Sequence, residues 1–284
     1  MITSRRNAKI KLARALRQRK HRDANGLFLV EGIRHVGEAV EARAHIDAIY
    51  YAPELLTSQF AQDLIEQQST HGLPCYALAA DVFDSLVEKE NPQGILAVVH
   101  QGRLSLSGLS PRKVGWGVAV VEPQDPGNVG TILRTIDAVG ASGLILLENS
   151  VDPYHATAVR ASMGALFWLP VVTASFVEFA AWARENRYHV YGTSAHAERD
   201  YREVGVYRTP LVLLMGSERE GLADYQDDIC VQLLRLPMKG KVTSLNLAVA
   251  TGVMLYEMLG SLEGGDECQG KKSLFLVEIE KNRR

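Results

Sequence analysis

The stretch from residue 118 to 147 reads VAVVEPQDPGNVGTILRTIDAVGASGLILL and carries a complete strand–helix–strand pattern. The uninterrupted apolar runs at 118–121 and 143–147 are typical of strands that are buried on both faces. Between them, apolar side chains recur at helical spacing, which gives the intervening helix one apolar face: Val129, Ile132, Ile136 and Val139. Two buried strands joined by a helix predict a parallel sheet covered by helices on both faces.

The same alternation continues beyond this stretch and predicts one α/β domain over residues 114–262. Further strands are expected at 169–172, 188–192, 211–215 and 231–236. Helices are expected at 156–165, 176–185 and 245–259. After Gly260 the composition becomes polar and rich in glycine, so residues 263–284 are interpreted as a tail.

A second, smaller α/β domain is predicted for residues 1–101. Short apolar strands are expected at 26–30, 46–51, 75–78 and 94–99. Helices are expected at 4–20, 32–41, 58–69 and 80–88, the first with Ile10, Ala13 and Leu16 on its apolar side. The serine- and glycine-containing stretch 102–113 is interpreted as the linker between the two domains.

Positive charge is concentrated at the N-terminus. Residues 1–22 hold nine of the 31 basic residues and none of the 33 acidic ones, which leaves 22 bases against 33 acids, or −11, for the rest. Such a block is typical of a surface that binds phosphates. A solvated helix face and a mitochondrial-type presequence are the alternatives. The candidate RNA contacts are Arg5, Arg6, Lys9, Arg17, Arg19, Lys20 and Arg22.

Several classes of protein are disfavoured by composition. No apolar run is long enough to span a membrane, and no apolar stretch of a secretory signal follows the basic N-terminus, so a cytoplasmic protein is expected. The three cysteines form no CxxC pair and the eight histidines no HxxH pair, so no metal site is expected. The GxGxxG fingerprint of dinucleotide-binding proteins is absent after the strand at 118–121.

Three segments could carry chemistry, and each follows a predicted strand. The first, 122–134, turns on Pro126 and Gly127 and enters a helix for which Asn128 is the expected N-cap. The second, 216–221, is an acidic loop bounded by glycines, which let backbone approach a ligand closely. The third, 236–250, is a basic loop leading into a helix that is expected to begin near Ser244. Taken singly, they could be an ordinary strand–turn–helix, a surface turn and a helix cap.

Taken together and in order, the three segments resemble the signature motifs of the SpoU family, RNA ribose methyltransferases of the SPOUT superfamily. The first motif, N-x-G-x-x-x-R, is present as Asn128, Gly130 and Arg134. The second is present as Gly216, Glu218 and Gly221. The third is present as Leu236, Pro237, Met238, Ser244, Leu245 and Asn246, although Ala248 stands where the family often has a small hydroxyl residue. The N-terminal part also resembles the substrate-binding domain of family members that act on ribosomal RNA.

The resemblance implies a parallel α/β domain with a C-terminal trefoil knot, and a homodimer with active sites near the subunit interface. It implies that S-adenosylmethionine is bound by Met215, Gly216, Gly221, Leu236, Met238 and Leu245. It assigns catalysis and ribose positioning to Arg134, Asn128, Glu218, Ser244 and Asn246, without a metal. Since a guanidinium normally stays protonated, either Arg134 or an RNA phosphate held by Arg134 would accept the ribose proton.

The expected function is therefore methylation of a ribose 2′-oxygen, with 23S ribosomal RNA favoured as substrate because of the added N-terminal domain. Transfer RNA is the alternative substrate. An RNA-binding protein without activity and a Rossmann-type nucleotide enzyme are alternatives of a different class. Binding of S-adenosylmethionine would separate the enzyme from the inactive RNA-binding protein. The modified nucleotide, and the choice between a housekeeping and an antibiotic-resistance role, stay open.

Overall fold

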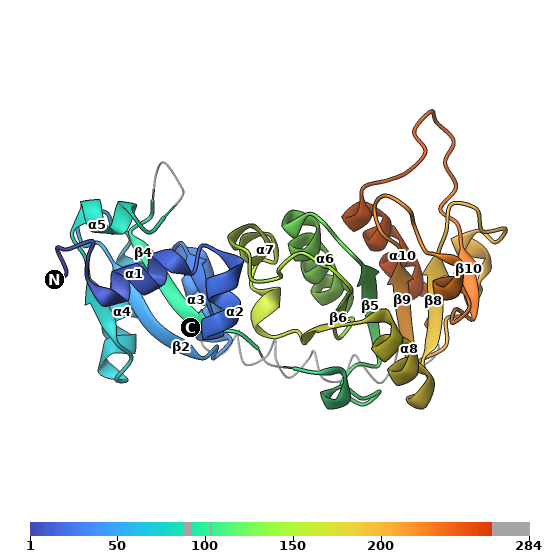
Figure 1. Cartoon of the computed structure of the whole chain (residues 1–284), viewed down its shortest axis with the longest axis horizontal. Coiled ribbons are helices and arrows are strands. Elements are labelled where there is room, and N and C mark those ends of the chain that lie inside the picture. Colours follow the sequence, from blue (N-terminus) through green and yellow to red (C-terminus); the bar gives the residue numbers. More distant parts are fainter. Residues whose placement is uncertain (88–91, 103, 263–284) are drawn as a thin grey trace, which may run out of the picture.

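The computed structural model describes residues 1–87, 92–102 and 104–262, and Figure 1 shows two α/β units side by side. The tail expected at 263–284 lies outside the described residues, as does the last residue of the helix expected at 80–88. Within the described part of the chain, no helix combines the length and the apolar character needed to cross a membrane.

The larger unit is built on a six-stranded sheet in which all neighbouring strands are parallel, in the order β10-β8-β9-β5-β6-β7. The strands are β5 Trp116–Val121, β6 Leu144–Leu147, β7 Val171–Ala174, β8 His189–Thr193, β9 Leu211–Met215 and β10 Gln232–Leu234. The helices are α6 Pro126–Val139, α7 Ala156–Ala161, α8 Phe176–Glu185, α9 Asp224–Asp227 and α10 Leu247–Ser261. Short 3-10 helices occupy Leu106–Gly108, Ala165–Phe167 and Tyr201–Glu203.

Helices cover both faces of this sheet, as predicted. Along β5, Val118 and Val120 join the core that contains the buried residues of α6 and α10, whereas Ala119 and Val121 join a second core with α8. Successive side chains of a strand point to opposite faces. A strand that is apolar throughout therefore needs a helix layer on each side, which explains the uninterrupted apolar runs in the sequence.

Helix α6 starts earlier than expected. Its N-cap is Asp125, whose side chain accepts a hydrogen bond from the Gly127 amide, and Pro126 takes the first helical position. The prediction that Asn128 is the N-cap is wrong, because an aspartate followed by proline already provides the cap and a pre-set first turn. Asn128 instead lies inside the first turn and is buried.

Gly130 of α6 lets α7 approach at close range. A Cβ at this position would lie 2.4 Å from the carbonyl oxygen of Ala158 and 2.6 Å from the Cβ of Ala161. Any larger residue would have to separate the two helices, since such contacts are too short for real atoms. The motif glycine is thus explained by helix packing, and α7 lies directly against the helix that carries Asn128.

The smaller unit has a four-stranded sheet in the order β1-β4-β2-β3. Its strands are β1 Leu27–Glu31, β2 Ile46–Tyr51, β3 Cys75–Ala77 and β4 Ile95–His100, with only β2 and β3 parallel. Its helices are α1 Ala8–Ala15, α2 Arg19–Asn25, α3 Ile33–Glu41, α4 Gln59–Thr70 and α5 Ala80–Asp84. In Figure 1, α7 lies between this unit and α6.

The single helix expected at 4–20 is wrong in one respect, because two helices, α1 and α2, occupy this region. The apolar side is as predicted, with Ile10, Ala13 and Leu16 buried. The break occurs at Gln18, whose backbone is extended. The guanidinium of Arg22 donates to the carbonyls of Leu16 and Arg17, and so satisfies groups that a helix end leaves without partners.

Candidate active site

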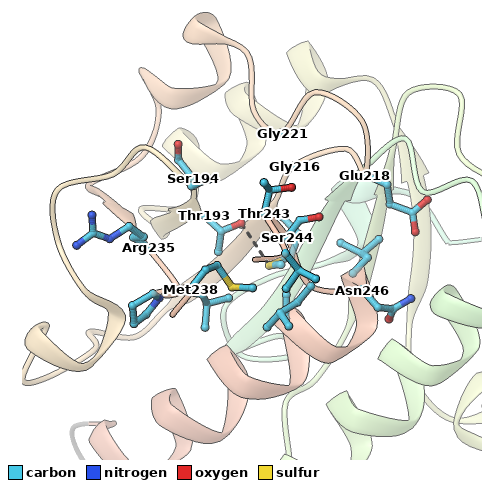
Figure 2. A pocket seen from close by; sticks show the side chains of 18 of the residues that line it. Thr193, Ser194, Gly216, Glu218, Gly221, Arg235, Met238, Thr243, Ser244 and Asn246 are labelled. Atoms are coloured by element: carbon cyan, nitrogen blue, oxygen red, sulfur yellow. Dashed lines mark hydrogen bonds between the residues drawn. The ribbon is translucent and has the colours of Figure 1, made fainter. Parts of the chain in front are cut away.

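A cavity of about 840 Å³ lies where three neighbouring strands, β8, β9 and β10, end. Its walls come from residues 193–195 after β8, residues 215–218 and Gly221 after β9, and residues 234–247 around and after β10 (Figure 2). Loops at the carboxyl ends of strands in open α/β sheets are the usual place for ligand binding. The volume is within the range of about 300–1,000 Å³ that is common for small-molecule sites.

The second and third motifs meet at this cavity. All six residues expected to contact the cofactor line it: Met215, Gly216, Gly221, Leu236, Met238 and Leu245. Three of the five expected catalytic residues line it as well, namely Glu218, Ser244 and Asn246. The strand pairing β10-β8-β9 brings these two loops together, although β8, between them in the sheet, precedes both in the sequence.

The backbone of the second motif forms a tight loop. Ser217 and Gly221 exchange two backbone hydrogen bonds, of 2.9 and 3.0 Å, and Gly221 has a φ of +73°. A Cβ on Gly216 would lie 2.3 Å from the carbonyl carbon of Gly221. Glycine is therefore required at Gly216 for space, and it is favoured at Gly221 by the backbone conformation.

A chain of side-chain hydrogen bonds joins all three motifs. The Nδ2 of Asn246 donates to the Oδ1 of Asn128 at 2.9 Å, and the Nδ2 of Asn128 donates to the Oε1 of Glu218. Asn128 is 7% exposed and does not line the cavity itself; it supports the two residues that do. This series of hydrogen bonds ends on the carboxylate of Glu218, which only accepts hydrogen bonds. The side-chain amides of Asn128 and Asn246 can therefore each take only one orientation.

Asn246 has a second task as the N-cap of α10. Its Oδ1 accepts hydrogen bonds from the amides of Ala248 and Val249. The helix therefore begins at Leu247, and the expected start near Ser244 is wrong. The residues before it, including Ser244, form an irregular wall of the cavity, and Figure 2 shows Ser244 and Asn246 among the lining side chains.

Arg134 does not reach the cavity within one chain. It lies six residues after Asn128, about one and two-thirds turns along α6. Consequently Asn128 is buried whereas Arg134 is exposed, and Arg134 is absent from the residues that line the cavity. The structure thus separates the motif-one arginine from the other four expected catalytic residues.

Several cavity residues were missed from sequence. The hydroxyl of Thr193 donates to the sulfur of Met215 at 3.6 Å, and Ser194 and Ala195 follow it along the wall. The basic side chains of Arg235, Lys239 and Lys241 also border the cavity. A signal for Thr193 and Ser194 was present, because they directly follow the strand expected at 188–192 and parallel strands present their carboxyl ends at one edge.

The basic block at the N-terminus is largely exposed, with one exception. Six of the seven candidate RNA contacts are exposed: Arg5, Arg6, Lys9, Arg17, Arg19 and Lys20. The seventh prediction, Arg22, is wrong, because this residue is 4% exposed and pairs with Asp152. A guanidinium buried against a carboxylate cannot contact a phosphate on the surface.

The surroundings of the two cysteines described in the structure disfavour the thiolate form. Burial, with a smaller contribution from Asp227, raises the pKa of Cys230 to about 12, and burial also raises the pKa of Cys75. Both thiols are thus protonated near neutral pH, where only a thiolate is reactive. Among the described residues there is no cluster of three or more histidine, cysteine, aspartate or glutamate side chains that could hold a metal ion.

Comparison with known proteins matches both units. Residues 116–256 match the SpoU rRNA Methylase family, and residues 7–97 match the MRM3-like substrate binding domain. The chain is 34% identical over 264 residues to the 23S rRNA (uridine(2479)-2'-O)-methyltransferase of Streptomyces viridochromogenes, and the match covers 90% of each. It is 30% identical to the 23S rRNA (guanosine(2553)-2'-O)-methyltransferase RlmP of Bacillus subtilis strain 168, covering 91% of this chain and 99% of that protein.

Solved structures agree with these matches. The AdoMet-bound rRNA methyltransferase from Sinorhizobium meliloti superposes with a TM-score of 0.82 at 35% identity, covering 90% of this chain and 96% of that one. AviRb from S. viridochromogenes, a SpoU methyltransferase in complex with AdoMet, gives a TM-score of 0.80 at 32% identity, covering 89% and 97%. The resemblance inferred from the three motifs is confirmed: the chain belongs to the SpoU rRNA methylase family and carries an MRM3-like substrate-binding domain at its N-terminus.

Proposed function

We propose that this protein transfers a methyl group from S-adenosylmethionine to a ribose 2′-oxygen of 23S ribosomal RNA. The observation that carries the proposal is the hydrogen-bonded chain Asn246–Asn128–Glu218, which joins all three motifs beside one cavity. The names of the relatives, which are 23S rRNA 2'-O-methyltransferases, support the substrate. The AdoMet complexes of similar chains support the cofactor.

The cavity suits S-adenosylmethionine in size and in chemistry. The backbone at Gly216 and Gly221 borders the cavity, and Leu236, Met238 and Leu245 supply apolar contacts. The lining also carries polar and charged side chains, among them Ser194, Arg235 and Lys239, which can bind the polar parts of the cofactor. When bound, the cofactor supplies an electrophilic methyl group on a sulfonium.

The residues of this chain then have to orient the ribose and manage its proton. In the proposal, Glu218 and Asn246 contact the ribose at the edge of the cavity, and Asn128 fixes their orientation from behind. Ser244 adds a hydroxyl on the same wall. Arg134 holds an RNA phosphate, because a guanidinium is a strong phosphate ligand and a poor proton acceptor. That phosphate accepts the 2′-hydroxyl proton as the ribose oxygen is methylated.

We further propose a homodimer formed through the exposed face of α10. Val249, Tyr256 and Leu259 are 53%, 59% and 46% exposed, although they belong to a strongly apolar helix. Exposed apolar surface on a helix is a common sign of an association site. Helix α10 packs beside α6 at Gly252 and Thr135, so a second copy on this face would approach the exposed side of the helix that carries Arg134.

The proposed organisation keeps the domains at 1–101 and 114–262, joined by the linker at 102–113, and places the protein in the cytoplasm with the ribosome. The exposed basic side chains between residues 5 and 20, in and next to α1 and α2, form the proposed RNA-binding surface. The trefoil knot implied by family resemblance stays a prediction.

Methyl transfer tests the proposal directly. Purified protein, labelled S-adenosylmethionine and either 23S rRNA or tRNA from a strain lacking the gene should give label in 23S rRNA only, at one ribose. Label in tRNA would support the alternative substrate. Cofactor binding without transfer to either RNA would contradict both, and absence of cofactor binding would favour an RNA-binding protein without activity.

A further inference from the structure

A buried ion pair joins the two units. The Nη2 of Arg22 lies 2.6 Å from the Oδ2 of Asp152, and its Nε donates to the same oxygen at 2.6 Å. The two side chains are 5% and 6% exposed. They are 130 residues apart in sequence, with Arg22 on α2 and Asp152 in the segment after β6. The remaining carboxylate oxygen of Asp152 accepts from the amide of Tyr154.

On the catalytic side, the segment that holds Asp152 is tied to the helix of the first motif. The amide of Val151 donates to the carbonyl of Pro123, three residues before α6 begins, and the hydroxyl of Ser150 donates to the carbonyl of Leu147. Three residues after Asp152, His155 caps α7, and α7 packs against Gly130 of α6. Asp152 is therefore held next to the loop that leads into α6 and, through α7, is linked to the helix that carries Asn128.

On the RNA-binding side, Arg22 fixes the two basic helices. Its Nη1 donates to the carbonyl oxygens of Leu16 and Arg17, at 2.9 and 2.8 Å, at the end of α1. The neighbouring Arg19 donates to the carbonyl of Ser150 at 3.0 Å, next to the same segment. One guanidinium on α2 thus connects the segment that follows α1 with the catalytic unit.

Holding two surfaces together with a buried ion pair costs free energy of folding. Removing both charges from water costs several kcal/mol for each ion, and apolar replacements of the same volume are often as stable. What a guanidinium in this position adds is direction, because its planar donors have to meet the carboxylate and the carbonyls at defined angles. The arrangement is suited to fixing one orientation of the basic helices relative to the cavity.

We propose that Arg22 is a positioning residue for methyl transfer: its pair with Asp152 orients the basic surface of α1 and α2 so that bound RNA presents its ribose to the cavity. This inference rests on the proposed function. It predicts that loss of the pair leaves RNA and cofactor bound, yet slows the reaction of the bound complex. A merely structural role would change the amount of folded protein and not the rate of each folded site.

Arg22→Met removes the charge and keeps most of the side-chain volume. We expect its single-turnover rate at saturating 23S rRNA, counted per cofactor-binding site from calorimetry, to fall by tenfold or more, since misplacement by about 1 Å can cost about 100-fold. The dissociation constants for RNA and for S-adenosylmethionine should stay at their wild-type values. Arg22→Lys, which keeps the charge but not the planar donors, should lie between wild type and Arg22→Met.

Arg34→Met is the matched control. It removes one positive charge from the same unit, and its pair with Glu38 is exposed on the Arg34 side. Its rate should equal that of wild type. An unchanged rate for Arg22→Met would overturn the proposal, as would loss of RNA affinity with an intact rate, which would make Arg22 a phosphate contact. If Arg22→Met does not fold, the rates and affinities of Arg22→Lys and Asp152→Asn are compared with wild type instead.

A measurement without catalysis separates failure of this inference from failure of the proposed function. Spin labels at the exposed residues Gln67 and Glu185, on α4 and α8, report the distance between the units after the native cysteines are replaced by serine. Arg22→Met should broaden the distance distribution and Arg34→Met should not. An equally narrow distribution in Arg22→Met would overturn the proposal even if the RNA substrate proves to be different.

Discussion

The side chain of Asn246 makes two kinds of hydrogen bond, one to the start of a helix and one to a residue of the first motif. Its side-chain oxygen caps α10, and its side-chain nitrogen donates to Asn128. Aspartate can perform the first task but not the second, because an ionised carboxylate only accepts hydrogen bonds. Alanine can perform neither. The two substitutions therefore separate helix stability from the order of the site.

We expect Asn246→Asp and Asn246→Ala to lower methyl transfer to a similar extent while differing in stability. Alanine should reduce the free energy of unfolding by about 0.5–2 kcal/mol through loss of the cap. Aspartate should lose less, because the cap remains. Urea unfolding and methyl-transfer assays measure the two properties. Wild-type activity in Asn246→Asp would show that the bond to Asn128 is not needed.

A substitution at Gly216 tests whether the loop at 216–221 binds the cofactor. In Gly216→Ala the new Cβ would lie 2.3 Å from the Gly221 carbonyl carbon, so the loop has to open. We expect the affinity for S-adenosylmethionine, measured by calorimetry, to fall by about tenfold or more, equivalent to about 1.4 kcal/mol. Gly108→Ala, whose Cβ meets no atom within 4 Å, is the control and should bind normally. Equal affinities would move the cofactor away from this loop.

A substitution at Arg134 tests whether this residue acts in methyl transfer without contributing to cofactor binding. It is exposed and outside the cavity lining, so Arg134→Ala should leave the affinity for S-adenosylmethionine unchanged. If Arg134 holds the RNA phosphate, methyl transfer should be abolished. Calorimetry and labelled methyl transfer measure the two effects. Loss of cofactor affinity together with residual turnover would contradict the assigned role.

Among the elements, the first two helices carry the proposed recognition surface. Deleting residues 1–22 would not test it cleanly, because the deletion removes the fully buried side chains of Ile10 and Ala13 as well as the charges. Substitution of exposed bases avoids this problem. Arg6, Lys9 and Lys20 are exposed, and the contact of Lys9 with the Tyr76 ring lies within the smaller unit.

We expect the triple variant Arg6→Gln, Lys9→Gln and Lys20→Gln to bind RNA more weakly and with a flatter dependence on salt. Each lost phosphate contact should reduce the slope of log affinity against log salt by roughly 0.7–0.9. Filter binding over a series of salt concentrations measures the slope. A variant with three glutamines at the exposed residues Arg112, Arg184 and Arg187 controls for net charge. Equal slopes for both variants would mean that α1 and α2 do not contact RNA.

At the scale of the whole molecule, the proposed dimer depends on the exposed face of α10. Tyr256→Glu places a charge in that face, and burying an unpaired charge is costly. Sedimentation should therefore show dimers for the wild-type protein and monomers for Tyr256→Glu. Phe60→Glu, which alters a similarly exposed aromatic side chain on α4, should remain dimeric. A wild-type monomer would refute the homodimer.

Much of the architecture could be read from the sequence because its signals are local. A buried parallel strand is apolar at every position, and a covering helix repeats its apolar residues at a spacing of three or four. The runs at 118–121 and 211–215 and the helix at 176–185 therefore agree with the structure almost residue by residue. The motif residues were also identifiable, since each follows the end of a predicted strand.

Tertiary structure alone decided which polar side chains became partners. Arg22 looked like its eight basic neighbours, but its burial depends on Asp152, 130 residues away. Asn128 looked like a helix cap, but Asp125 takes that place and Asn128 turns inward to Glu218 and Asn246. Periodicity reports which face of an element is apolar, whereas the fate of a charge or an amide depends on groups that only the fold brings within hydrogen-bonding distance.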